Sequence, residues 1–308
     1  MNGDGRTERR ATMKKWTVAI LMAVAGSLSA AERPGAAFLS MGVGARAAAL
    51  SSAYTGVADD TSALYWNPAG LAGLTHREGL LSYAASFSDQ RHNFAGYAQP
   101  TQRGAFGLGA VYLGQGRLEG RGADRQKTGS FGAADTAFIV GAARRLSPGL
   151  SAGANLKLIR ETIGSETAQG MALDLGATYR PPVRWLQTGA AVRNLGPGLS
   201  FAREKFALPA TLTAGAAARL SNLGLASFDI DYKLVEKKAE AKAGFEWSPG
   251  SAFALRAGYA SPLAGAGVGA SGFVWGLGVA HGRYRLDYAM VPGEALGDTQ
   301  QVSLRVGF

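Results

Sequence analysis

Cysteine is absent from the 308 residues, so the chain can form neither a disulfide nor a thiolate metal site. Charged residues are also few: Asp, Glu, Lys and Arg make up 18% of the chain, against about 25% in soluble globular domains. After residue 31, no stretch approaches the roughly 18 consecutive apolar residues that indicate a membrane-spanning helix. The sequence therefore leaves two classes open, a soluble protein and a membrane β-barrel.

Signatures of enzyme chemistry are missing as well. The histidines are His76, His92 and His281, and no HExxH, GxSxG or phosphate-cradling loop occurs. A lipase or acyltransferase that uses His281 with a nearby serine is the alternative, and no triad spacing supports it. We predict that the protein is not an enzyme and has no catalytic residue, no metal and no cofactor.

Basic residues outnumber acidic ones, and the formal net charge is +10. Residues 1–31 hold five basic and two acidic residues, which leaves 27 basic and 20 acidic residues and a net charge of +7. These cations form no run on one helical face and no nucleic-acid-binding motif. We expect them in a barrel lumen and at its rim, and we predict no nucleic-acid partner.

Residues 1–31 have the three parts of a secretory signal peptide. Lys14 and Lys15 precede the apolar run 16–26, and Ser29 and Ala31 suit the −3 and −1 positions of a cleavage site. The run is shorter than the roughly 20 residues that span a bilayer. Met13 is a candidate start, with residues 1–12 as an upstream extension; a buried N-terminal helix is the alternative.

Between residues 78 and 308, many segments show a strict two-residue alternation. In residues 301–308, apolar side chains fall at Val302, Leu304, Val306 and Phe308, with polar or small residues between them. One face of each such segment is apolar and often aromatic at its ends, and the other is glycine, alanine or charged. Small residues fit a crowded lumen, and aromatic strand ends fit the girdles at membrane interfaces.

We therefore predict an all-β fold, a transmembrane antiparallel up-and-down β-barrel of about 14 strands over residues 78–308, with a short N-terminal helical plug. Counts of 12 and 16 strands are the alternatives. The expected strands are 78–87, 91–99, 104–114, 133–145, 150–161, 168–180, 186–195, 209–219, 225–234, 238–247, 252–260, 271–281, 283–291 and 299–308.

Parity places one group of charged side chains in the lumen. Its members are Asp174, Asp229, Asp231, Arg256, Arg285, Asp287 and Arg305. Enclosed charges pair across strands or meet water, so structural pairing is the first interpretation and contact with a substrate the alternative.

Phe308 ends the last alternating strand. Such a terminus resembles the signal that the barrel-assembly machinery of the outer membrane reads, and a chance aromatic terminus is the alternative. We expect the protein in the outer membrane of a Gram-negative bacterium, with that machinery and outer-membrane lipids as partners.

Residues 32–77 lack the alternation and are rich in small residues. Asp60 is a good N-cap for a short helix over 61–66, and Pro68 ends it because the residue before proline avoids the α region. Asp59 and Asp60 cap this helix or, alternatively, meet a lumen arginine such as Arg46. We expect a plug, or hatch, inside the barrel mouth.

The segment Trp66-Asn67-Pro68-Ala69-Gly70-Leu71, together with Gly44-Ala45-Arg46 and Ala58-Asp59-Asp60, resembles the N-terminal signature of the PorV/PorQ family. That family is similar to the FadL-type outer-membrane transporters of fourteen strands, which carry an Asn-Pro-Ala element in an N-terminal hatch. The resemblance covers essentially all of the mature chain. Residues 67–70 form the moving part of a gate or, alternatively, a helix stop that ties the plug to the wall.

The resemblance implies three functions between which the sequence does not decide. The first is a FadL-like channel for small hydrophobic solutes. The second is a PorV-like component of type IX secretion that binds exported proteins. The third is a structural barrel without cargo.

Overall fold

The computed structural model describes residues 34–85, 90–121, 124–201, 204–221, 224–264, 272–293 and 297–308. The expected signal peptide, residues 1–31 with its upstream extension 1–12, lies outside the described residues.

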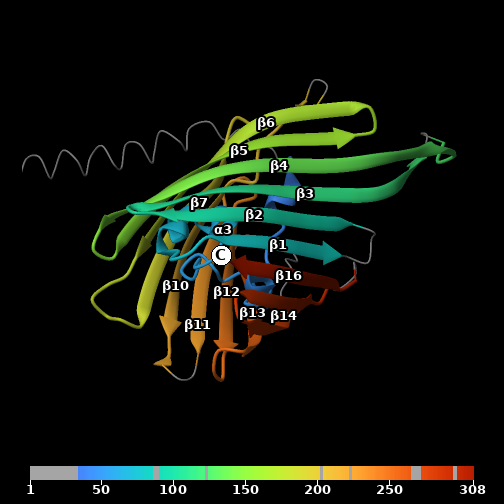
Figure 1. The fold of residues 1–308 in the computed structure, drawn as a ribbon. Helices are drawn as coiled ribbons and strands as arrows, with labels where there is room; N and C mark the ends of the chain where they lie inside the picture. The colour runs from blue at the N-terminus through green and yellow to red at the C-terminus, as the bar shows by residue number, and fades with distance from the viewer. Residues whose placement is uncertain are drawn as a thin grey trace, which may run out of the picture.

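Within these residues, fourteen antiparallel strands close into one barrel (Figure 1). Strands that follow one another in sequence pair with each other; in addition β7 pairs with β10, and β1 closes the ring against β16. This confirms the predicted fold class and the count of 14. The barrel strands are β1 (Glu78–Ala85), β2 (Arg91–Thr101), β3 (Gly104–Arg121), β4 (Lys127–Ser147), β5 (Leu150–Ile163), β6 (Glu166–Tyr179), β7 (Leu186–Leu195), β10 (Thr211–Arg219), β11 (Leu225–Lys233), β12 (Lys238–Trp247), β13 (Phe253–Ala264), β14 (Gly272–His281), β15 (Tyr284–Val291) and β16 (Thr299–Gly307).

The β3–β4 hairpin is longer than predicted. Residues 115–121 of β3 continue to pair with residues 127–133 of β4, where we expected a loop. Side chains on both faces of this extension are mostly exposed, so it has no buried face to impose an alternating pattern. The hairpin projects beyond the neighbouring strands in Figure 1.

A small hairpin was also missed, formed by β8 (Leu199–Phe201) and β9 (Glu204–Phe206). Three residues are too few to show a period. The hairpin has a role in the wall, because β6 pairs with β7 only from Leu173 onward. The fully buried Leu199 packs against Gly170 and covers part of the remaining edge, as an unpaired strand edge requires.

The outer surface of the barrel is apolar. On β14, Phe273, Trp275, Leu277 and Val279 are 41–58% exposed, whereas the inward Val274 is 5% exposed. Exposing apolar surface to water costs about 25 cal/mol per Å², so this belt suits the hydrocarbon of a bilayer. Among the described residues, no helix is long and apolar enough to cross a membrane.

The barrel has two different ends. At one end, which we call the Phe308 end, the backbone N–H of Phe308 donates to the carbonyl of Arg77 at 2.9 Å, and the β2–β3 and β14–β15 turns are short. The opposite end, which we call the loop end, carries the connection 196–210 and the tip of the β3–β4 hairpin.

Residues 34–77, which we call the plug, thread the lumen from one end to the other, inside the ring of strands (Figure 1). At the loop end, Gly35 N–H donates to the carbonyl of Ala207 at 2.9 Å. At the Phe308 end, Arg145 Nε donates to the carbonyl of Ala72 at 3.1 Å. The plug contains η1 (Ala37–Ser40), α2 (Ala45–Ala49), α3 (Ala63–Trp66) and η2 (Pro68–Gly73).

The helix expected over 61–66 begins later, at Ala63. The Asp60 carboxylate accepts the Ser62 N–H at 2.9 Å, which forms a turn before the helix starts. The helix ends as predicted: Asn67 is extended, with φ −160° and ψ 102°, and Pro68 begins η2.

Candidate functional site: the plug and its polar anchors

The plug contacts the wall closely because the inner face is rich in glycine. A Cβ on Gly153 of β5 would lie 2.5 Å from the carbonyl carbon of Pro68, and one on Gly258 of β13 would lie 2.5 Å from Ser51 N. These distances are shorter than real Cβ contacts. The inward glycines, in which sequence analysis saw only small lumen residues, are therefore the seats of the plug backbone.

Arg46 of α2 is the centre of a buried ion network. Its Nε lies 2.7 Å from Glu246 Oε2 of β12, and its Nη1 lies 2.5 Å from Asp59 Oδ1. Tyr54 Oη accepts a further hydrogen bond from Nη1 at 2.9 Å. Burial opposes the charge on Arg46, but Asp59 and Glu246 outweigh it and raise the pKa of the guanidinium well above its usual value.

Asp59 joins the plug to a second strand, since its Oδ2 lies 2.9 Å from Arg219 Nη2 of β10. Burial alone would raise the pKa of this carboxyl, but Arg46 and Arg219 hold it well below its usual range. Of the two interpretations of Asp59, the structure shows the contact with a lumen arginine.

Asp60 combines both interpretations. One carboxylate oxygen accepts from Ser62 in the turn before α3, and the other accepts from Tyr54 Oη at 2.8 Å. The same oxygen lies 3.8 Å from Arg46 Nη1 and 3.7 Å from Arg305 Nη1. Asp60 therefore both orders the turn and lies among the arginines.

Arg256 extends the network along the wall. Its fully buried side chain lies 2.6 Å from Glu246 Oε2 and 2.8 Å from Asp287 Oδ1. The neighbouring strands β12 and β13, and β15 on the far side of β14, thus contribute to one chain of charges that begins at the plug. Glu246 is the link, and sequence analysis missed it because nothing in strand parity distinguishes it from other inward residues.

Asp229 of β11 holds the plug without a cation. Its Oδ2 accepts the backbone N–H groups of Tyr54 and Thr55 at 3.0 and 2.8 Å. Its neighbour Asp231 instead pairs with Lys242 at 2.7 Å and lies 3.7 Å from Arg193.

Asp174 belongs to a separate buried cluster on β5, β6 and β7. It lies 2.8 Å from Lys157 Nζ and accepts the Asn194 N–H at 2.8 Å. Asn155 donates both to Asp174 and to the carbonyl of Leu64 in the plug. Lys157 is 1% exposed, and a fully buried lysine in a strand carries no sequence signal that separates it from a rim lysine.

The segment from Trp66 to Gly70 is packed into the wall. Trp66 Nε1 donates to the carbonyl of Val43 at 3.0 Å. Asn67 Nδ2 donates to the carbonyls of Thr55 and Ala177 at 3.0 and 3.1 Å, and Asn67 Oδ1 accepts the Ala69 N–H at 3.2 Å. Pro68 lies against Gly153, and Gly70 lies against Ala58 so closely that no Cβ fits.

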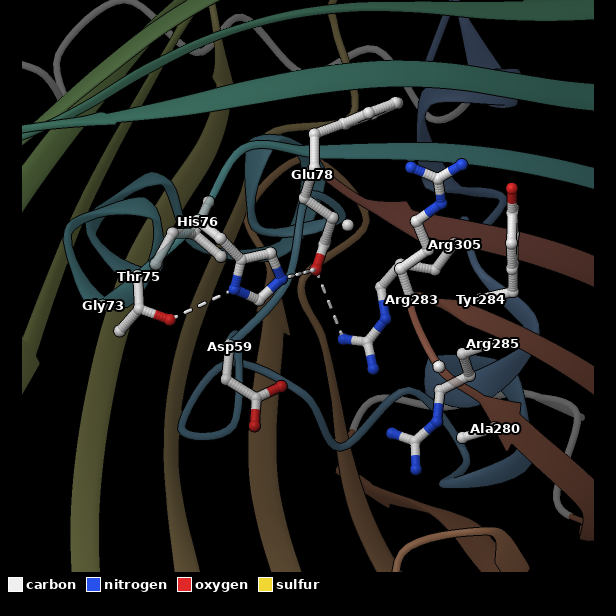
Figure 2. A pocket seen from close by; sticks show the side chains of 14 residues that line it. Asp59, Gly73, Thr75, His76, Glu78, Ala280, Arg283, Tyr284, Arg285 and Arg305 are labelled. Carbon is white, nitrogen blue, oxygen red and sulfur yellow. Dashed lines mark hydrogen bonds and ion pairs between the residues drawn. The ribbon is translucent and has the colours of Figure 1, made fainter.

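A cavity of about 560 Å³ opens beside the plug at the Phe308 end. Arg283, Arg285 and Arg305 line one side, opposite Asp59, His76 and Glu78 (Figure 2). Apolar lining comes from Leu74, Ala280 and Phe308. Across the described ranges, no group of three or more His, Cys, Asp or Glu side chains could hold a metal ion.

Comparison with known proteins agrees with this architecture. The model of a family described as "Uncharacterised protein family (UPF0164)" matches residues 31–179. No curated protein matches the chain.

Several solved barrels have the same fold. The CymD monoaromatic hydrocarbon channel is similar with a TM-score of 0.68 and 13% identity, over 87% of this chain and 98% of its own. The Ralstonia pickettii toluene transporter TbuX is similar with a TM-score of 0.59 and 15% sequence identity, over 80% of this chain and 94% of its own. A Pseudomonas aeruginosa FadL homologue has a TM-score of 0.58 and 12% sequence identity, over 82% of this chain and 95% of its own. At these identities the likeness concerns the fold.

Proposed function

We propose that this protein is an outer-membrane barrel that passes small hydrophobic solutes past its plug. The observation that carries the proposal is the threaded lumen. Wall side chains fill the interior of an 8-stranded barrel, whereas larger barrels enclose cavities or channels. Here inward glycine and alanine residues leave the lumen wider still, and the plug occupies it, held against the wall by non-covalent contacts.

The outer membrane is the location that the predicted signal peptide, the apolar belt and the predicted assembly signal at Phe308 support together. Bacterial barrels carry short turns on the periplasmic side and longer loops outside. The Phe308 end would therefore face the periplasm, and the loop end would face the exterior.

Two features support a hydrophobic solute. The half of the lumen toward the loop end is lined by buried apolar side chains of the wall, among them Val111, Ile139 and Ile159, which form one cluster with Phe38 of the plug. In addition, the similar barrels include a monoaromatic hydrocarbon channel and toluene transporters. The polar anchors of the plug lie mainly in the other half, where hydrogen bonds can exchange when the plug moves.

In this proposal the plug is attached to the barrel wall by the segment Asn67, Pro68, Ala69 and Gly70, and this segment does not move during gating. The Asn67 side chain forms three hydrogen bonds, and Pro68 lies against Gly153. The more mobile part would be the stretch that Arg46 and Asp59 hold through charges.

The test is uptake of radiolabelled toluene by intact cells at low concentration, in a strain that lacks the gene and in the same strain with the gene restored. We expect the restored gene to raise the initial uptake rate several-fold and to leave uptake of a polar solute of similar size unchanged. Equal toluene uptake in the two strains would contradict the proposal.

The same strains test the PorV-like adaptor function. If deletion leaves toluene uptake unchanged but lowers the amount of exported protein at the cell surface, the barrel serves secretion instead. If deletion changes neither toluene uptake nor the amount of exported protein at the cell surface, the third function, a structural barrel without cargo, is supported.

A further inference from the structure

The cavity at the Phe308 end contains an arginine, Arg285, that has no acidic group within ion-pair distance among the described residues. Arg285 forms no ion pair within 4 Å and no hydrogen bond among the described residues, and its buried Nε has no hydrogen-bond partner. The neighbouring lumen charges, by contrast, have short contacts: Arg256 with Asp287 at 2.8 Å and Arg46 with Glu246 at 2.7 Å.

The strand register makes this arrangement costly. Arg285 of β15 lies directly opposite Arg305 of β16, and its other cross-strand neighbour is Ala280. Like charges that face each other across strands destabilise a sheet. Arg305 has distant acidic neighbours, Asp60 at 3.7 Å and Glu78 at 3.6 Å, whereas Arg285 has none within that range.

The acids that line the cavity are engaged elsewhere. Asp59 is held by Arg46 and Arg219. Glu78 Oε1 accepts the N–H and the hydroxyl of Thr61 at 2.7 and 2.8 Å, and its Oε2 lies 3.6 Å from Arg305 Nη1, so neither acid pairs with Arg285. On the open side, the Arg283 guanidinium lies 5.2 Å from the ring centre of Tyr284. The Arg285 guanidinium is thus left at the cavity without an acidic group in contact (Figure 2).

We propose that this cavity is a binding site for a compact, singly charged organic carboxylate, with Arg285 as its main ligand. A guanidinium binds a carboxylate through two parallel hydrogen bonds. One carboxylate balances the uncompensated charge of Arg285, whereas a phosphate dianion would be repelled about twice as strongly by Asp59 and Glu78. The apolar lining of Leu74, Ala280 and Phe308 would contact the body of the ligand, and about 560 Å³ is within the range of small-molecule sites.

The test of this site measures binding and not uptake, so its outcome is independent of the toluene uptake test. The purified full-length barrel in a non-ionic detergent is titrated with benzoate by calorimetry, with benzyl alcohol and inorganic phosphate as parallel titrants. We expect benzoate to bind in a one-to-one ratio, and each of the other two to bind at least about tenfold more weakly.

Arg285→Gln should weaken benzoate binding about tenfold or more, because a charged hydrogen-bond partner is lost. Arg103→Gln is the matched control: Arg103 is exposed in the β2–β3 turn at the same end and does not line the cavity. Arg285→Lys should retain part of the affinity.

Folding defects are separated from binding by the melting temperature. Arg285→Gln removes the repulsion from Arg305, so the unliganded variant should melt no lower than the wild type. No benzoate binding to the wild type, unchanged binding by Arg285→Gln, or equal binding of benzyl alcohol or phosphate would each overturn the proposal.

Discussion

Single polar side chains in this lumen mainly form hydrogen bonds and ion pairs that hold the plug against the wall. Asp229 illustrates the point, since one carboxylate oxygen accepts two consecutive backbone N–H groups of the plug. A buried N–H without an acceptor costs about 1–3 kcal/mol. The inward carboxylates therefore have a measurable structural role whether or not a solute also meets them.

Asp229→Ala should lower the free energy of unfolding by about 1–3 kcal/mol, because the Tyr54 and Thr55 N–H groups lose their acceptor. Urea unfolding in detergent micelles, followed by tryptophan fluorescence, measures this. Ile230→Val, on the lipid-facing neighbour of Asp229, should change it much less. Similar losses for both variants would refute the fastening role.

Arg256 permits a test of coupling between wall charges. Arg256→Met leaves Asp287 buried without a cation, and breaking a buried pair costs roughly 3–5 kcal/mol. Adding Asp287→Asn should recover part of that loss, because the stranded charge is then removed. A double-mutant cycle from urea unfolding gives the coupling, and strictly additive losses would show that the pair does not interact.

Asp59 permits a test by pH. Its pKa in the folded protein is lowered by Arg46 and Arg219, so its contribution to stability is complete above its unfolded pKa of about 4. It is lost only as the pH falls through the lower folded value. The stability difference between wild type and Asp59→Asn should thus be constant from pH 7 to about pH 5 and should shrink only in stronger acid. A difference that already vanishes between pH 7 and 5 would contradict the ion pair.

At the scale of elements, strands were predictable and contacts were not. Alternation in segments such as 273–280 reports directly on the two faces of a wall strand, so the fourteen strands and the inward set were within reach of sequence. The outer half of the β3–β4 hairpin could not be predicted from the sequence, because both of its faces are exposed. The sequence also could not indicate the roles of Glu246, Lys157 and Asn194, since their partners lie tens to hundreds of residues away.

The glycine seats give an element-scale prediction. Gly153→Ala places a methyl group against the backbone of Pro68 and Ala69, so η2 should be pushed off β5. We expect a lower melting temperature and faster cleavage within residues 67–74 by an added protease. Gly132→Ala is the control, because a Cβ there meets nothing within 4 Å; equal effects of the two variants would show that the seat is unimportant.

For the whole molecule, the ring closes where β1 meets β16, beside Phe308. The predicted assembly signal can be separated from stability at this point, because the Phe308 side chain is 67% exposed. Phe308→Ala should lower the amount of barrel in outer-membrane fractions several-fold, while the refolded protein keeps its melting temperature. A normal membrane level would argue against a sorting role.

Because the barrel wall is a closed ring of strands, it encloses the plug on all sides. A segment that enters at one end of a closed ring and leaves at the other cannot move out sideways; it must slide along the axis, or the β1–β16 seam must open. The N–H of Ala45, near the start of the described chain, donates to Ser303 of β16, the last strand of the barrel. Once β16 has paired with β1, the closed ring surrounds the plug, and the ring therefore retains the plug in addition to the contacts between them.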